Sequence, residues 1–433
     1  MFNNLNNFVK SEGFLKYFKN TSLLLTDKVL RIFIGLFVGV WVAKYLGPNQ
    51  FGVFAYVNSV VGLFSAIAAM GLNELIVQKI VIGKYDLNEI LGTAFYLKIG
   101  GFLATLVCII ITMFIIDSDY YTKSLIIILT FGFLFQSFNV IEFYFQSQVD
   151  SKYILIINSG ALVISTLIKI ICILLKADLL LFVVITSLDF LIMSVGYVFF
   201  YKRKTKLSIS DWKWECTLAK KLLKESWPLI ISSLSFVVYN NIDKIMLKSL
   251  LDDYSVGIYS AATRLVIPWQ FIPGLIISSF MPALVRGYED SLQLFNYRIK
   301  YLGSFLIWIS FILVFLYTFF SEELIFLTFG SDYRESANIT VYLIWTNVFV
   351  FFNSLWNRWM MIENNTKITF YFSLITSVLN VILNYFMITT YGVKGACFAL
   401  LISLTITSFV FYVIIDSRVI KLFFKSLLFI KNR

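Results

Sequence analysis

The chain has 433 residues, of which 59% are hydrophobic and 14% are charged, and its mean hydropathy is +0.83. This apolar fraction far exceeds what a soluble core needs and indicates a polytopic membrane protein. The net charge of +11 reflects membrane topology and anionic lipid headgroups, because no soluble basic domain is present to bind nucleic acid. Because the chain has no histidine and only four widely spaced cysteines, we expect no metal site, no disulfide framework and no cofactor.

Twelve segments are long and apolar enough to cross a hydrocarbon core about 30 Å thick. We therefore expect an all-α fold with twelve transmembrane helices, arranged as two six-helix lobes around a central cavity. The predicted spans cover residues 21–43, 51–70, 90–115, 124–146, 153–175, 179–200, 228–250, 257–284, 300–320, 338–361, 367–388 and 395–415.

The first span begins with a charged cluster. Residues 2–19, which precede it, alternate aromatic and basic side chains and are predicted to form a short amphipathic helix on the inner membrane surface. Asp27 and Arg31 are four residues apart, and Lys28 and Arg31 are three apart, so one helix face carries a net positive charge. A local ion pair with a snorkelling lysine is the alternative to a ligand-binding role.

The following spans of the N-terminal half contain isolated polar residues. Lys98 and Lys169 lie too deep in their spans for easy snorkelling. Asp189 is near the middle of the sixth span, either as a functional carboxylate or as the structural partner of one of these lysines. The fourth span carries a polar stripe that either joins helices or lines a cavity, and this stripe consists of Gln136, Asn139, Glu142 and Gln146.

A polar segment with eight basic residues separates the two sets of six spans. We expect residues 1–200 to form the N-terminal lobe, 201–226 a flexible basic cytoplasmic linker, 227–415 the C-terminal lobe and 416–433 a basic amphipathic cytoplasmic tail. Residues 51–56, FGVFAY, match residues 256–261, VGIYSA, at the starts of spans two and eight. Both motifs run inward, which predicts a parallel repeat.

The seventh span places polar groups where a membrane helix normally has none. It is predicted to begin near Pro228, which suits the first turn of a helix, and it contains Asn240, Asn241, Asp243 and Lys244. Each charge at such depth costs about 2.5–3.5 kcal/mol on insertion scales, so we expect this helix to line a transport path. As the deepest carboxylates, Asp189 and Asp243 are our candidates for a coupling-ion site.

Two later spans complete the set of candidate residues. Arg264 lies in the eighth span, where Pro268 and Pro273 remove helical hydrogen bonds and predict a bend or hinge. The eleventh span carries Asn380 and Asn384 on one face.

Three stretches together resemble a known family. They are VAKYLGPNQFGVFAY (42–56), SWPLIISSLSFVVYNNIDKIMLKSLLDDYSVGIYSAATRL (226–265) and SVLNVILNYFMITTYGVKGACFALLIS (377–403). With these three stretches in this order, the chain resembles the O-antigen flippases (Wzx-type) of the multidrug/oligosaccharidyl-lipid/polysaccharide exporter superfamily. The resemblance implies a multidrug and toxin extrusion-like fold that moves an undecaprenyl-diphosphate-linked oligosaccharide across the bacterial inner membrane by alternating access. It assigns Asp243 and Lys244 to the family-like pattern of span seven, and Arg31 to the basic position of span one.

The charge balance within the spans agrees with an anionic substrate, since the spans contain seven cations and only four carboxylates. Amides and aromatic rings suit sugar hydroxyls and sugar faces. The expected diphosphate-binding residues are Arg31, Lys28, Lys98, Lys169, Lys244 and Arg264. The expected sugar-binding residues are Gln136, Asn139, Asn240, Asn380 and Asn384.

The distribution of basic residues predicts the orientation. With both termini in the cytoplasm, 23 Lys and Arg residues fall in inner segments and six in outer loops, as the positive-inside rule requires. We expect no enzymatic activity, a monomer, and contact with other polysaccharide assembly proteins. A multidrug exporter of the same fold and, less favoured, a membrane enzyme acting on lipid-linked sugars are the alternatives.

Overall fold

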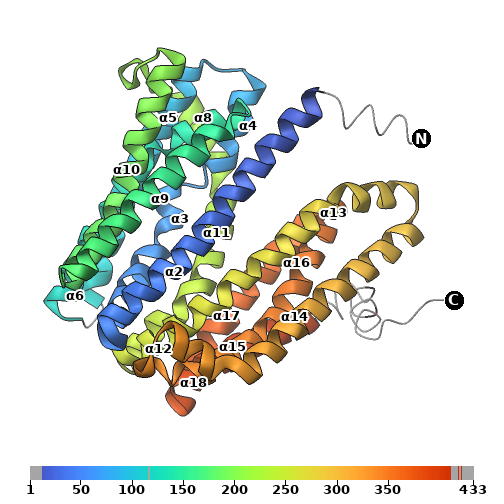
Figure 1. Cartoon of the computed structure of the whole chain (residues 1–433). Helices are drawn as coiled ribbons and strands as arrows, with labels where there is room; N and C mark the ends of the chain where they lie inside the picture. The colour runs from blue at the N-terminus through green and yellow to red at the C-terminus, as the bar shows by residue number, and fades with distance from the viewer. Residues whose placement is uncertain (1–11, 116–117, 411–417, 419–420, 422–433) are drawn as a thin grey trace. The chain divides into compact units, whose positions relative to one another are not determined.

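The computed structural model describes residues 12–115, 118–410, 418 and 421 (Figure 1). Every regular element among them is a helix, as the sequence predicts. Most of the predicted amphipathic tail, residues 416–433, lies outside the described residues, as does the start of the predicted N-terminal surface helix.

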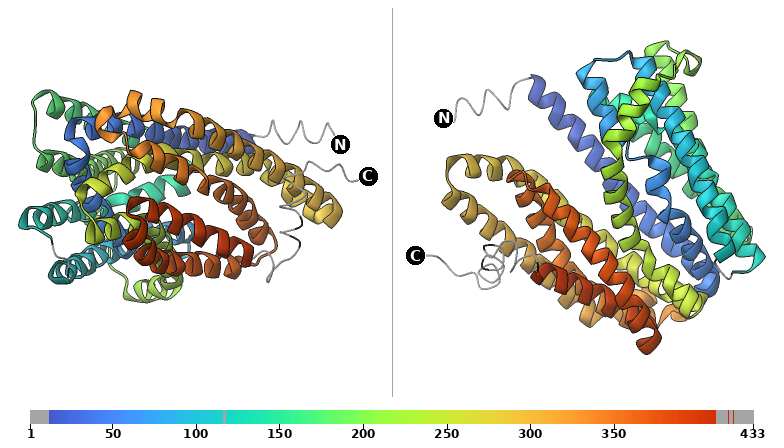
Figure 2. Two further views of the ribbon diagram at one scale, coloured as in Figure 1. Left: turned by 90° about the horizontal axis from the view of Figure 1, so that it is seen from below. Right: turned by 180° about the vertical axis from the view of Figure 1, so that it is seen from behind.

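The chain divides into two compact units. Unit 1 comprises Met1–Tyr45 and Val57–Val237. Its elements are the corresponding parts of α2 (Glu12–Leu63) and α11 (Cys216–Leu250), together with α3 (Ser65–Ala69), α4 (Asn73–Ile82), α5 (Leu87–Ile115), α6 (Tyr120–Thr130), α7 (Gly132–Gln136), η1 (Ser137–Asn139), α8 (Val140–Ser147), α9 (Ser151–Leu174), α10 (Leu179–Thr205) and η2 (Ile209–Asp211). Figures 1 and 2 show α9 beside α10, and these two helices pack together.

Unit 2 comprises Leu46–Tyr56 and Val238–Arg433. It contains the remaining parts of α2 and α11, followed by α12 (Asp253–Val266), η3 (Ile267–Gln270), α13 (Phe271–Asp290), α14 (Leu292–Thr328), η4 (Ser331–Tyr333), α15 (Ser336–Ile344), α16 (Thr346–Ile362), α17 (Thr366–Tyr391) and α18 (Val393–Val410). Helices α17 and α18 form its most extensive helix pair (Figure 2).

Eleven helical segments in the described part of the chain are long and apolar enough to span a membrane. The predicted seventh span lies in α11, which is not among them, because Asn240, Asn241, Asp243 and Lys244 lower its hydropathy. The expectation that this helix begins near Pro228 is wrong. It begins at Cys216, an exposed residue, and continues through Pro228 to Leu250.

The predicted fourth and eighth spans are interrupted helices. The first is divided into α6, α7, η1 and α8, and the second contains the 3₁₀ turn η3 between α12 and α13. Helix α2 is kinked at Gly47, where φ is 69°, a conformation that glycine adopts without strain. Several predicted spans, including the second and the tenth, are therefore not continuous helices.

The segment expected to be a flexible linker is packed within unit 1, so its predicted flexibility is wrong. Trp212 is only 6% exposed. The Lys213 N–H donates to the Asn88 carbonyl at 3.1 Å, and the Glu215 N–H donates to Thr93 Oγ1 at 3.0 Å. A basic sequence of this kind looks solvated, but its Trp and backbone groups are used to pack against α5.

Candidate functional site

Asp243 of α11 is the centre of a buried hydrogen-bond network in unit 2. The Tyr259 hydroxyl donates to Asp243 Oδ2 at 2.6 Å, and Asn384 Nδ2 donates to Asp243 Oδ1 at 2.6 Å. Asn384 Nδ2 also donates to Asn380 Oδ1 at 3.1 Å. Asp243 is 4% exposed and both asparagines are fully buried. Three helices thus enclose one carboxylate with oxygen and amide groups, an arrangement able to hold a proton or a small cation.

This network contains unsatisfied polar atoms. Asn380 Nδ2 and Asn384 Oδ1 are buried and lack a hydrogen-bond partner among the residues that the structure describes. Since leaving such groups unpaired costs about 1–3 kcal/mol each, they are positioned for a ligand or water.

A cationic group lies in the same unit. Arg264 of α12 stacks its guanidinium on the Phe51 ring, with 5.3 Å between Cζ and the ring centroid. Its Nη1 is buried and has no hydrogen-bond partner in the described part of the chain. Tyr333 lies in η4, and burial raises the pKa of its hydroxyl, so this neighbour stays neutral and does not cancel the Arg264 charge. Lys244, partly buried, also lies near Arg264.

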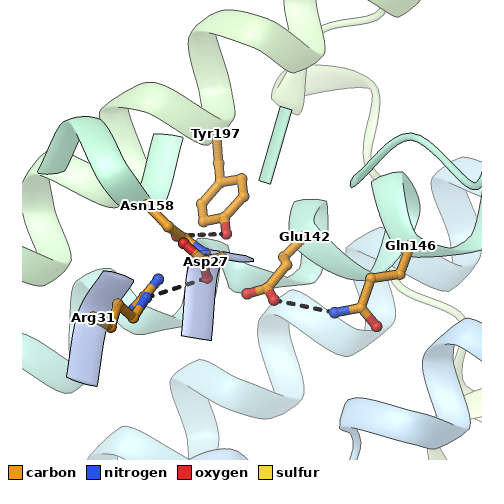
Figure 3. A network of polar contacts seen from close by, with 6 residues as sticks. All are labelled: Asp27, Arg31, Glu142, Gln146, Asn158 and Tyr197. Atoms are coloured by element: carbon orange, nitrogen blue, oxygen red, sulfur yellow. Dashed lines mark hydrogen bonds and ion pairs between the residues drawn. The ribbon is translucent and has the colours of Figure 1, made fainter. Parts of the chain in front are cut away.

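The predicted charged cluster of the first span belongs to a second network, in unit 1 (Figure 3). Arg31 Nε donates to Asp27 Oδ2 at 3.2 Å, so the local ion pair considered from the sequence is formed. Asn158 Nδ2 donates to the same Asp27 oxygen at 3.3 Å, and the Tyr197 hydroxyl donates to Asn158 Oδ1 at 3.0 Å. Arg31 keeps 40% of its side chain exposed, and Lys28 is exposed. The pair therefore leaves Arg31 accessible to an anion.

The two other deep lysines of unit 1 both have protein partners. Lys98, 4% exposed, donates from Nζ to Asn73 Oδ1 at 3.3 Å, and its Nζ lies 4.7 Å from the centroid of the Phe143 ring. Lys169 forms an ion pair with Asp189 at 3.2 Å. Of the two roles considered for Asp189, the structural partnership with a lysine is the one that the geometry displays.

The remaining sequence candidates occupy less defined positions. Gln136 ends α7, Asn139 lies in η1 and Asn240 lies in α11, and all three are partly buried. Pro268 occupies η3 and Pro273 the first turn of α13, so the predicted interruption of this helix is present.

Sequence reasoning missed Asn158, Tyr197 and Tyr259, which complete the two networks, and it missed Asn73, which accepts a hydrogen bond from Lys98. Asn158 is the one amide side chain in the predicted span 153–175, and this was a usable signal. The tyrosines gave none, because tyrosine in a membrane helix is ordinarily an interface or packing residue.

Solved structures share this fold. An inward-facing multidrug resistance MATE family transporter of the MOP superfamily has a TM-score of 0.72 at 17% identity, covering 90% of this chain and 95% of that protein. The lipid II flippase MurJ in its inward closed conformation has a TM-score of 0.71 at 18% identity, covering 94% and 91%. The protein is thus a multi-pass membrane protein with the multidrug and toxin extrusion-like fold, which confirms the predicted fold class.

Sequence comparison gives the family. The capsular polysaccharide biosynthesis protein CapF of Staphylococcus aureus is 22% identical over 394 residues, which are 89% of this chain and 96% of CapF. Residues 17–287 match the family described as Polysaccharide biosynthesis protein, and residues 228–386 match the MatE family. The chain belongs to the Polysaccharide biosynthesis protein family, within the multidrug/oligosaccharidyl-lipid/polysaccharide exporter superfamily, as its three sequence motifs indicated.

Proposed function

We propose that this protein is a flippase that moves an undecaprenyl-diphosphate-linked oligosaccharide, the repeat unit of an O-antigen or similar surface polysaccharide, across the bacterial inner membrane. The family described as Polysaccharide biosynthesis protein supports the substrate class. The shared fold with MurJ, which is a lipid II flippase, supports the type of movement. In this proposal the protein is a transporter that works by alternating access and not an enzyme.

The observation that carries the proposal is the buried Nη1 of Arg264, which has no hydrogen-bond partner among the residues that the structure describes. A guanidinium donates paired hydrogen bonds to phosphate oxygens, and such bonds are strong in a site of reduced dielectric. Asp243 is a buried carboxylate of the same unit, but its oxygens accept from Tyr259 and Asn384. Arg264 is therefore available for an anion, and Lys244 adds a second positive charge beside it.

Unit 1 offers a second anion-binding position at Arg31. Arg31 donates to Asp27 through Nε, so its outer guanidinium nitrogens can donate to an anion. By contrast, the ion pair of Lys169 and the enclosure of Lys98 favour structural roles for these lysines. We accordingly rank Arg264, Lys244 and Arg31 as the diphosphate-binding residues, with Lys28 as a supporting charge.

Asp243 is the preferred coupling-ion residue in this proposal. Asp189 has a lysine partner, whereas the Asp243 network has hydrogen-bond donors and a spare amide oxygen on Asn384. An acidic group with such neighbours can exchange a proton or a cation without leaving an unpaired charge.

The sugar-binding residues, the two lobes and the orientation stay predictions in this proposal. Gln136, Asn139 and Asn240 stay assigned to the sugars, since amides hydrogen-bond to hydroxyl groups, whereas the other two predicted amides, Asn380 and Asn384, are assigned to the Asp243 network. The distribution of basic residues supports an orientation with both termini in the cytoplasm.

A deletion and replacement experiment tests the proposed function. Loss of the gene should abolish surface polysaccharide and accumulate the lipid-linked intermediate, and the wild-type gene should restore both. Arg264→Met should fail to restore export at normal protein levels, whereas Arg264→Lys should restore part of it, because a lysine keeps the charge without the planar fork. Arg286, which is exposed in α13, provides the control Arg286→Met. Full export by Arg264→Met, or a deletion strain with normal polysaccharide, would contradict the proposal.

A further inference from the structure

Glu142 of α8 has no part in the function proposed above, but it lies beside the network that holds Arg31. Gln146 Nε2 donates to Glu142 Oε1 at 3.1 Å. Figure 3 shows the Glu142 carboxyl group directed toward Asp27 and the Tyr197 hydroxyl, with which it also interacts. Glu142 therefore joins the Asp27 network from α8, together with Gln146.

The hydrogen-bond donors around Glu142 are few enough to assign. Asn158 Nδ2 donates to Asp27, so Asn158 Oδ1 is an acceptor and takes the single hydroxyl proton of Tyr197. With its proton directed to Asn158, the Tyr197 oxygen can only accept. A hydrogen bond between Glu142 and Tyr197 then requires a proton on Glu142.

The charges facing Glu142 are consistent with this assignment. From α5, Lys98 directs Nζ to Asn73, and from α2, Arg31 pairs with Asp27. From α4, Lys79 forms an ion pair with Glu225 at 2.6 Å. Helix α9 presents the neutral Asn158 and α10 presents Tyr197. Among the described residues, no cation forms an ion pair with the Glu142 carboxylate.

We propose that Glu142 is a protonation site of unit 1 and that its charge is coupled, through Tyr197 and Asn158, to the pair formed by Asp27 and Arg31. The proton comes from water and bonds to Oε2, since Oε1 already accepts from Gln146. The new O–H donates to the Tyr197 oxygen, so every donor in the chain from Glu142 to Asp27 points the same way.

When Glu142 loses its proton to water, the hydrogen bond between Glu142 and Tyr197 reverses its direction. The ionised carboxylate is the stronger acceptor, so the Tyr197 hydroxyl turns to Glu142 and leaves Asn158 Oδ1 without a donor. Asn158 is then less firmly oriented, and its hydrogen bond to Asp27 weakens. Protonation of Glu142 therefore stabilises the ion pair between Arg31 and Asp27, and ionisation of Glu142 weakens this ion pair. The consequence for transport rests on the proposed function, in which Arg31 contacts the diphosphate.

Infrared difference spectroscopy of the purified full-length protein tests the protonation site without any transport assay. A carboxylic-acid C=O band should appear as the pH is lowered and should be missing from Glu142→Gln. If Glu142→Gln does not fold, Glu142→Asp provides the second variant and should keep a band at a displaced frequency. Asp189→Asn is the control and should leave the band unchanged. A band that persists in Glu142→Gln with an unchanged midpoint would overturn the site.

A double-mutant cycle tests the coupling. Asn158→Ala removes the rival acceptor of the Tyr197 proton, so the ionised form of Glu142 takes that proton without leaving Asn158 Oδ1 unpaired, and the band midpoint should fall by about one pH unit. In the Tyr197→Phe background the same substitution should have no such effect. An equal displacement in both backgrounds would show that the coupling does not pass through Tyr197 and would overturn it. Because neither measurement involves the lipid-linked substrate, failure of the proposed function would leave both results readable.

Discussion

Gly52 of α2 and Gly257 of α12 pack against each other's helix backbones within unit 2. A Cβ on Gly52 would lie 1.8 Å from the Asp253 carbonyl oxygen, and a Cβ on Gly257 would lie 2.0 Å from the Pro48 carbonyl oxygen. These are the glycines of the two motifs, FGVFAY and VGIYSA, that match in the sequence. The matching positions thus form one reciprocal contact, which requires the absence of a side chain on both helices.

Substitution at this contact should be strongly destabilising. Gly257→Ala places a methyl group against backbone that cannot rotate away, so the two helices must separate, at a cost of about 3 kcal/mol or more. We expect a clear fall in the thermal midpoint of the purified protein. Gly160→Ala in α9, where a Cβ would meet nothing within 4 Å, is the matched control and should be neutral or slightly stabilising. Equal midpoints for the two variants would contradict the close packing.

Substitutions at the ion pair of Asp27 and Arg31 distinguish between two roles for Arg31. If Arg31 contacts the diphosphate, Arg31→Ala should abolish export and Asp27→Asn should not restore it. If Arg31 only neutralises Asp27, the double variant should recover export, because the uncompensated carboxylate has been removed. The measurement is surface polysaccharide at matched protein levels. Recovery in the double variant would refute ligand contact by Arg31.

Asp243 should control the dependence of transport on ion gradients. In proteoliposomes, Asp243→Asn should flip substrate at a rate that no longer responds to imposed proton or sodium gradients, since the neutral amide cannot exchange charge. Asp189→Asn should keep the response, because Asp189 is paired with Lys169. If the flipping rate of the wild-type protein responds to neither gradient, there is no basis for a coupling residue.

The interruption at η3 is held by Tyr317 as well as by Pro268. The Tyr317 hydroxyl donates to the Leu265 carbonyl at 3.1 Å and accepts from Trp269 Nε1 at 2.7 Å. Pro268→Ala alone should therefore leave the bend in place, whereas Pro268→Ala with Tyr317→Phe should allow an α-helical hydrogen bond at Leu265.

We expect the double variant to flip substrate more slowly with nearly unchanged substrate affinity, since the two substitutions remove none of the proposed ligand groups. Pro282→Ala, in the interior of α13, is the control. If Pro268→Ala alone slows flipping as much as the double variant, the role assigned to Tyr317 is wrong.

The interruptions in the predicted fourth and eighth spans show what the sequence could and could not predict. Pro268 marked the second interruption, because proline removes a donor. The first, around Ser137, has no proline. It is stabilised by Ser194 of α10, whose Oγ donates at 2.6 Å to the Phe135 carbonyl, and by close packing of Gly132 on Phe190. Such a partner is 59 residues away, so no local pattern predicts it.

The same limit applies to the candidate site. Spacing placed Asn380 and Asn384 on one helix face, and the polar content of the seventh span singled out Asp243. That Asn384 reaches Asp243 across 141 residues, with Tyr259 as a third member, follows only from tertiary packing. The linker was misjudged for a related reason, because the burial of Trp212 depends on a surface that α5 provides.

The exposure of Cys216 at the start of α11 makes it a native chemical marker. Cys172 and Cys397 are buried and Cys108 is partly buried, so a thiol-reactive reagent should modify Cys216 first. A bulky maleimide that does not cross lipid should leave intact cells unlabelled and react in inverted vesicles if this end of α11 faces the cytoplasm. The wild-type chain can thus report its own sidedness, with Cys216→Ser as the blank.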